Sequence, residues 1–171
     1  MRAAALWFPD WPVQAARLDS GDELAEPIAI AAQHRVKVCS HAARQLGIRR
    51  GMRVRNAQAV APELTVVDDN PDRDGRMFAS LAASFDEVAA SVEVLRPGLV
   101  VVDVEAAGRF HGGSEDKALE MLIDAASRRG IDAFVGAADE IATAVIAARC
   151  SQVVAPGASK DFLAAQPIGV L

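Results

Sequence analysis

Five arginines lie within a twelve-residue stretch, at Arg44, Arg49, Arg50, Arg53 and Arg55. A local patch of positive charge can bind the phosphates of nucleic acid or a surface of a partner protein. The alternative interpretation is a solvated face, which an arginine-rich loop forms without any ligand. Both interpretations remain open from the sequence.

The charge of the whole chain limits what this patch can do. The net charge is −5 and the pI is about 5.2, which argues against a protein that coats nucleic acid by bulk charge. Acidic residues crowd the stretch DDNPDRD (68–74) that follows the arginines. We therefore expect weak DNA binding at best.

Composition indicates a packed globular chain. Its 171 residues are 51% hydrophobic with a mean hydropathy of +0.17, which suits one sizeable core, or a core plus a small lobe. No apolar run approaches the ~20 residues of a membrane-spanning helix. The first residues reach Pro9 and Asp10 too early for a secretory signal. We expect a cytoplasmic protein.

Cysteine and histidine usage predicts neither a disulfide framework nor a metal site. Cys39 and Cys150 are the two cysteines, and there is no CxxC motif. His34, His41 and His111 are scattered along the chain. We expect no metal and no cofactor.

Apolar patterning predicts an α/β fold. Short apolar runs predict strands at 3–8, 27–32, 35–40, 64–69, 99–104 and 131–138. Helices are predicted at 13–18, 40–46, 56–62, 77–88, 114–130 and 139–150, with a polar turn at 70–75. The strand–helix–strand–helix order from 99 to 150 predicts a sheet with helices on one face.

Four segments, in order, resemble the Y-family (DinB/UmuC-like) DNA polymerases. They are LWFPDWPVQAA (6–16), SHAARQLGIRRGM (40–52), AVAPEL (59–64) and VEVLRPGLVVVDVE (92–105). The closing FLAAQPIGVL (162–171) resembles the start of the family's thumb. The resemblance implies a palm-like domain over 1–12 and 76–155, with a ferredoxin-like sheet and helices on one face. It also implies a small fingers-like lobe at 13–75 and a thumb-like start at 156–171.

The same resemblance places the family's metal-binding positions at Trp7, Pro9, Gly98 and Leu99. Nucleotidyl transfer needs two divalent ions clamped between carboxylates, and Mg²⁺ prefers hard oxygen ligands. None of these four side chains offers an oxygen. The resemblance therefore implies that this chain has no catalytic residues and is not an enzyme.

Neighbouring carboxylates are poor substitutes for the missing ligands. Asp10 lies one residue beyond its motif position, and one residue along a strand reverses the side-chain direction. Asp103 and Glu105 share a face but lie four or more residues beyond Gly98, a displacement of more than ~13 Å. We expect Asp103 to be structural.

Other positions that the family uses for nucleotide binding are changed as well. Pro12 stands where the family has its sugar-discriminating aromatic, and Val145 where it has a phosphate-binding lysine. Arg44 is retained, but an arginine there can equally bind a neighbouring carboxylate.

Within the family, these changes most resemble the non-catalytic ImuB-type proteins. FHGG at 110–113 also fits their pattern. This implies an adaptor in DNA-damage tolerance that bridges an error-prone C-family DNA polymerase, an ImuA-type or RecA-like protein and the sliding clamp. The implied location is the cytoplasm, where the protein would associate with the nucleoid after DNA damage. A divergent active translesion polymerase and an unrelated α/β interaction module are the alternatives.

Overall fold

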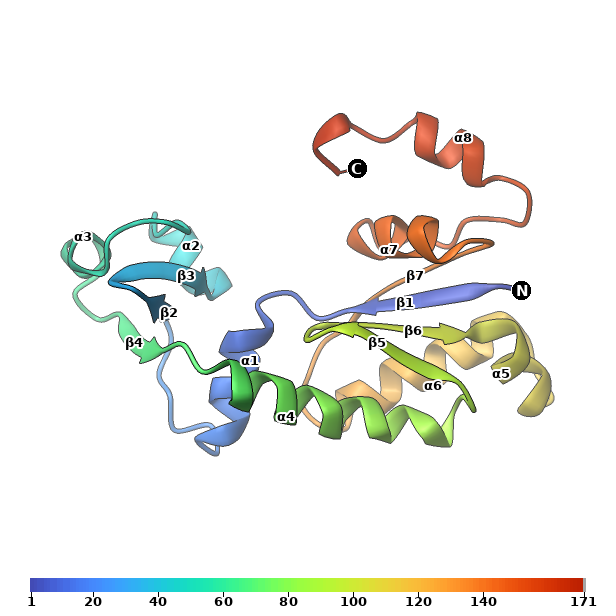
Figure 1. The fold of residues 1–171 in the computed structure, drawn as a ribbon, viewed down its shortest axis with the longest axis horizontal. Coiled ribbons are helices and arrows are strands. Elements are labelled where there is room, and N and C mark those ends of the chain that lie inside the picture. The colour runs from blue at the N-terminus through green and yellow to red at the C-terminus, as the bar shows by residue number, and fades with distance from the viewer. Residues whose placement is uncertain (171) are drawn as a thin grey trace. The chain divides into compact units, whose positions relative to one another are not determined.

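The computed structural model describes residues 1–170 and divides the chain into two compact units (Figure 1). The first unit comprises Met1–Pro9 and the chain from Ala79 onward, and the second is Asp10–Phe78. The fingers-like lobe was predicted at 13–75, so each boundary of the second unit lies three residues from its predicted position. Residues 156–170 fall in the first unit, and their assignment as a thumb-like start stays a prediction; Leu171 lies outside the described residues.

The first unit is built on a four-stranded antiparallel sheet. Its strand order is β5 (Val92–Arg96), β6 (Leu99–Asp103), β1 (Ala3–Trp7) and β7 (Phe134–Ala138). In chain order this is 2-3-1-4, the ferredoxin-like arrangement that the sequence resemblance implied. Because β1 is central, Trp7 lies opposite Leu99 on one side and Phe134 on the other.

Helices cover both faces of this sheet. The α7 helix (Ile141–Arg149) packs on one face, against Ala3, Ala5, Leu99 and Val101, and α6 (Glu115–Ser127) lies on the opposite face (Figure 1). The α/β fold class is confirmed, but the prediction that the helices cover only one face of the sheet is wrong. The reason is visible in β6, where Val100 and Val102 are buried as well as Val101, so the strand needs cover on both sides.

Close contact between α7 and the sheet depends on small side chains. Gly136 on β7 has no room for a side chain, because a Cβ there would lie 2.1 Å from the backbone nitrogen of Ala148. Ala144, Ala147 and Ala148 form the helix surface that faces the strands, and all three are fully buried. The alanine-rich helix can therefore lie directly on the β1–β7 pair.

Strand β5 and helix α5 (Val104–Phe110) are among the elements of the first unit that were not predicted. Edge strand β5 carries mostly exposed residues, so it lacks the apolar run that marks a strand. The α5 helix begins where the apolar run of β6 was expected to continue, because the Asp103 side chain accepts a hydrogen bond from Ala106 N and caps the helix. The remaining elements are the 3₁₀ turns η1 (Ser84–Glu87) and η2 (Ile168–Val170) and helix α8 (Ser159–Ala164).

The second unit is a three-stranded sheet with short helices. Its strand order is β3 (Arg35–Cys39), β2 (Ile28–Ala32) and β4 (Thr65–Asp68), and β2–β3 is the predicted hairpin. Gln33 and His34 both have positive φ, as a two-residue hairpin turn of type I′ requires. The helices are α1 (Trp11–Asp19), α2 (His41–Gln45) and α3 (Val54–Val60).

Helix α4 (Pro71–Ala83) begins inside the segment that the sequence predicted to be a polar turn. Proline suits the first helical position, where its missing N–H is not needed. The Asn70 side chain accepts a hydrogen bond from Arg73 N at 3.0 Å, which is the geometry of a helix cap. The polar residues are thus a helix start. Among the described residues no helix is long and apolar enough to span a membrane.

Candidate functional site

The four positions matched to metal ligands come from two segments that meet at one end of the palm-like sheet. Trp7 ends β1 and lies opposite Leu99, the first residue of β6. Phe8 N donates a hydrogen bond to the Gly98 carbonyl at 2.8 Å, so the chain stays paired one residue past the strand. Gly98 has φ 93°, a conformation that glycine adopts without strain and that the Pro97–Gly98 turn requires. Pro9 then follows Phe8.

The surroundings of these positions are apolar. The Trp7 ring packs against the Phe134 ring with centroids 5.6 Å apart, and Leu99 is buried. Val145 and Phe162 are partly buried against the same cluster. A divalent ion would lose its hydration shell here without gaining an oxygen ligand, so the residues present do not fit a pair of magnesium ions. Within residues 1–170 no group of three His, Cys, Asp or Glu side chains is arranged to hold a metal.

Asp10, the nearest carboxylate in sequence, is bound to an arginine. Arg44 Nη1 donates to Asp10 Oδ1 at 3.0 Å, and Arg44 Nη2 lies 2.9 Å from Asp10 Oδ2. This is a two-point contact that matches the guanidinium fork to the carboxylate. Asp10 has φ 57° and ψ 34°, a left-handed conformation that Asp tolerates better than most residues. It stands directly before helix α1.

Arg44 is the retained nucleotide-side residue, and its donors are largely occupied within the chain. Besides the two contacts to Asp10, Nη1 donates to the Cys39 carbonyl at 2.7 Å. The hydrogen bond with Asp10 raises the pKa of Arg44 above its ordinary value, so the guanidinium stays charged. The Asp10 carboxylate therefore contacts both terminal nitrogens of the Arg44 guanidinium.

Asp103 and Glu105 also have structural partners. Asp103 caps α5 through Ala106 N at 3.0 Å, in agreement with its predicted structural role. Glu105 lies 3.6 Å from the N-terminal ammonium group and 3.2 Å from Arg109. Neither carboxylate belongs to the Trp7–Gly98 end of the sheet, because Asp103 lies opposite Ala3.

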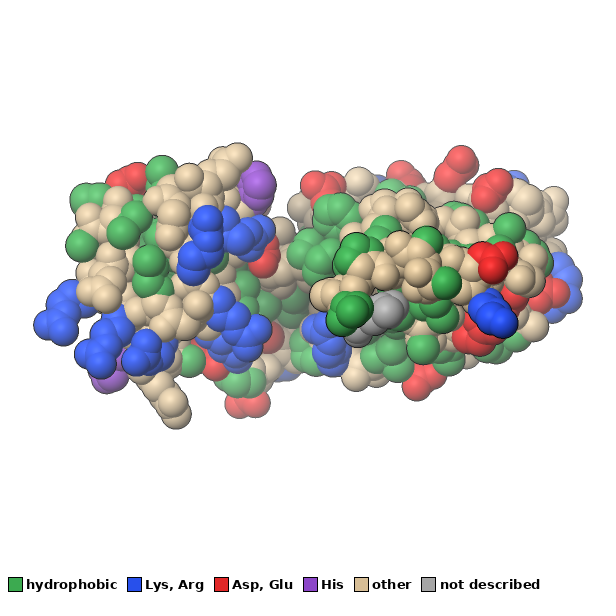
Figure 2. Space-filling view, turned by 90° about the horizontal axis from the view of Figure 1, so that it is seen from above, with side chains coloured by type: hydrophobic (Ala, Val, Ile, Leu, Met, Phe, Trp, Pro, Cys, Tyr) green, Lys and Arg blue, Asp and Glu red, His purple; other side chains and the backbone are tan. Residues whose placement is uncertain are grey.

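The structure divides the five candidate arginines. Arg49 Nη1 donates to the Arg44 and Ile48 carbonyls, at 2.7 and 2.9 Å, so it helps to hold the α2 end. Arg53 and Arg55 line a hollow of about 450 Å³ together with His34. Arg50 is exposed. Lys and Arg side chains gather on the part of the surface that these residues form (Figure 2).

Several contributions to the site were not evident in the sequence. Phe134 and Phe162 lie far along the chain from Trp7, and only the fold brings them together. His34 reaches the hollow because the hairpin turn projects it. Trp11 is 2% exposed, and its Nε1 donates to the Asp74 carbonyl at 2.9 Å.

Comparisons with known proteins identify the family. The model of the impB/mucB/samB family matches residues 6–149, so the chain belongs to this family of Y-family DNA polymerases and their relatives. This match excludes the unrelated α/β module that the sequence left open. The chain is 25% identical over 159 residues to DNA polymerase IV of Pseudomonas syringae pv. syringae (strain B728a). It is 24% identical to DNA polymerase IV of Pseudomonas savastanoi pv. phaseolicola (strain 1448A / Race 6).

The alignments cover 88% of this chain and 45% of each relative, so the chain spans about half the length of the curated relatives it matches. Among solved structures, Dbh DNA polymerase in an insertion ternary complex matches all of the chain with a TM-score of 0.81 at 19% identity. DinB from Sulfolobus solfataricus matches with a TM-score of 0.78 at 18% identity. The chain covers 54% and 53% of these two structures. This likeness shows a shared fold.

The Asp10–Arg44 pair should contribute measurably to stability. A double-mutant cycle with Asp10→Asn and Arg44→Gln should give a coupling energy of about 1 kcal/mol, because the contact is two-point but partly exposed. Urea unfolding of the four proteins measures it. The exposed pair Arg17–Glu26, at 3.3 Å, is the control and should couple less. A coupling near zero for Asp10–Arg44 would contradict a stabilising role for this pair.

Proposed function

We propose that this chain is the catalytically inactive, polymerase-like part of an adaptor in DNA-damage tolerance and translesion synthesis. The observation that carries the proposal is the apolar end of the sheet, where Trp7 and Leu99 lie opposite each other beside Gly98. Every position matched to a metal ligand lacks a side-chain oxygen, and the Trp7 ring packs against Phe134 instead of leaving room for ions. Such a centre cannot bind the two ions that nucleotidyl transfer needs.

A second observation supports the loss of nucleotide binding. The charge of the retained Arg44 is neutralised by Asp10. Val145, at the position matched to a phosphate-binding lysine, packs against an apolar cluster. A triphosphate would have to displace the Asp10 carboxylate from a two-point contact without help from a bound cation. The nucleotide-side residues therefore support the same function as the metal-side residues.

By its resemblance to ImuB-type proteins, the adaptor would bridge three partners. They are an error-prone C-family DNA polymerase, an ImuA-type or RecA-like protein and the sliding clamp, acting in the cytoplasm and on the nucleoid after DNA damage. No cofactor is required for this role. The retained palm and fingers shape would serve as a surface for assembly rather than as an enzyme.

A divergent active polymerase is the second candidate, favoured by the name of the two relatives, DNA polymerase IV. Primer extension separates the two functions. The full-length protein should give no template-dependent incorporation with Mg²⁺ or Mn²⁺, while a DNA polymerase IV assayed alongside extends the same primer. Incorporation that is abolished by Asp10→Ala or Asp103→Ala would establish the polymerase and overturn the adaptor proposal.

We also propose that the arginines at 44–55 give this chain a weak affinity for DNA. Arg53 and Arg55 are the best placed, because they line one hollow and, within residues 1–170, their side chains do not bond backbone carbonyls as that of Arg49 does. Reversing both to Glu should weaken binding. On single-stranded DNA it should also lower the slope of log affinity against log salt by up to about 0.7 for each phosphate that the variant no longer neutralises.

Fluorescence anisotropy with a single-stranded oligonucleotide over a salt series measures both quantities. The matched control reverses Arg128 and Arg129, which are exposed on the first unit. If the Arg53/Arg55 variant binds like the native chain, or if the control loses as much affinity, the hollow does not bind DNA.

A further inference from the structure

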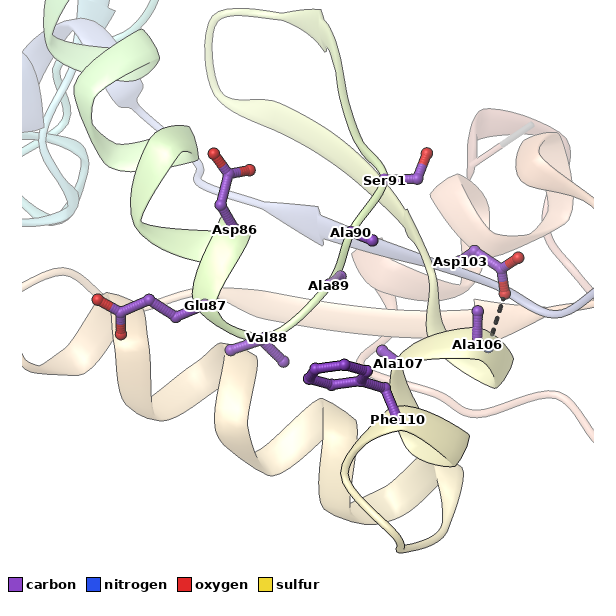
Figure 3. A pocket seen from close by; sticks show the side chains of 10 residues that line it. All are labelled: Asp86, Glu87, Val88, Ala89, Ala90, Ser91, Asp103, Ala106, Ala107 and Phe110. Carbon is purple, nitrogen blue, oxygen red and sulfur yellow. Dashed lines mark hydrogen bonds between the residues drawn. The ribbon is translucent and has the colours of Figure 1, made fainter.

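A pocket of about 330 Å³ opens on the first unit, away from the Trp7–Gly98 end of the sheet. Residues 86–91, at the end of η1 and after it, form one side of it, and Asp103 with helix α5 forms the other (Figure 3). Asp103 lies opposite Ala3, whereas Leu99 lies opposite Trp7. The four-residue offset corresponds to ~13 Å along the strand, so this pocket is distinct from the degenerate metal site.

The floor and one wall of the pocket are apolar. Val88, Ala89, Ala90, Ala106 and Ala107 line it together with the ring of Phe110. Phe110 is 83% exposed, although a phenylalanine normally buries most of its surface. Figure 3 shows the ring lying beside Val88 and Ala107 at the mouth of the pocket. An exposed aromatic ring next to an apolar hollow is typical of an interaction site.

The FHGG sequence holds this ring in place. His111 Nε2 lies 2.8 Å from the Val88 carbonyl, which makes Nε2 the donor and ties the end of α5 to the opposite wall. The Phe110 and His111 rings meet edge to face, with centroids 5.1 Å apart. Gly108 allows α5 to approach the start of α6, since a Cβ there would lie 3.0 Å from the Ser114 carbonyl oxygen. The His111 contact and the close approach at Gly108 thus join the end of α5 to the segment after η1 and to the start of α6.

The charged groups at the pocket all have one sign. Asp86, Glu87 and Asp103 line it, and none of the described residues that line it is Lys or Arg. Asp103 is engaged as the cap of α5, and the nearby Arg109 pairs with Glu105. This acidic rim repels nucleic-acid phosphate and favours a cationic partner.

We propose that this pocket docks a protein segment in which one large apolar side chain is flanked by Lys or Arg residues. The apolar side chain would enter between Val88, Ala107 and Phe110, and the basic flanks would meet Asp86 and Glu87. An apolar anchor in a small pocket with complementary charges at the rim is the usual composition of a protein interaction site. The inference goes beyond the proposed loss of catalysis and does not depend on it.

The test uses a fluorescein-labelled peptide of alternating Lys and Ala with one central Trp, followed by fluorescence anisotropy. The native chain should bind it saturably, and the same peptide with Ala in place of Trp should bind at least about tenfold more weakly. Phe110→Ala, and Ala106→Trp, which fills the pocket from an exposed position, should each weaken binding at least about tenfold. Asp86→Lys combined with Glu87→Lys should weaken binding more at low salt than at high salt.

Matched controls separate docking from general attraction to an acidic chain. Ile123→Ala removes an apolar side chain that is 41% exposed elsewhere on the first unit, and Asp22→Lys with Glu23→Lys reverses two exposed acids on the second unit. Both should leave the affinity unchanged. If the peptide without Trp binds equally well, or if the controls lose as much affinity as the pocket variants, the proposal that this pocket docks such a segment is wrong. If Phe110→Ala disturbs the circular dichroism spectrum, Ala106→Trp decides the outcome.

Discussion

The antiparallel pairing of β1 with β6 is the constraint on which the rest of the first unit depends. It places Trp7 opposite Leu99, keeps the Pro97–Gly98 turn within hydrogen-bond reach of Phe8, and brings Phe134 of β7 to the other side of Trp7. With α7 on one face and α6 on the other, both faces of the central strands are buried. A carboxylate at Trp7 or Leu99 would need a bound cation to offset its desolvation. The apolar side chains at these two positions carry no charge that needs such an offset.

A second consequence appears where the chain leaves the sheet. Directly after Pro9, Asp10 takes a left-handed conformation and helix α1 begins. Without the contact between them, the Asp10 carboxylate would be an unpaired negative charge and the Arg44 guanidinium an unpaired positive charge. Their contact satisfies both groups inside the second unit. Arg44, which the resemblance matched to a nucleotide-side position, is thus paired with a carboxylate of the same unit.

Much of the fold was predictable from local pattern. The runs 3–8, 35–40 and 99–104 are apolar enough to predict strands. Ser114 with its following acids predicts the start of α6, where Ser114 indeed accepts from Lys117 N. Strand β5 was missed because an edge strand with exposed residues carries no apolar run. Cover on both faces of the sheet was missed because the strand–helix–strand–helix order and the ferredoxin-like resemblance both indicated helices on one face. Asn70–Pro71 looked like a turn, and only its cap geometry shows a helix start.

The candidate site was predictable as a set of positions but not as a set of contacts. Motif order located Trp7, Pro9, Gly98 and Leu99, whereas the pairing of Asp10 with Arg44 joins residues 34 apart and needs the folded second unit. Loss of the metal site from the palm-like sheet can be measured by Mn²⁺ titration followed by electron paramagnetic resonance and by ¹H–¹⁵N spectra. We expect no stoichiometric Mn²⁺ binding and no selective broadening of the Trp7, Gly98 and Leu99 amide signals. Saturable binding of Mn²⁺ that broadens those signals selectively would contradict it.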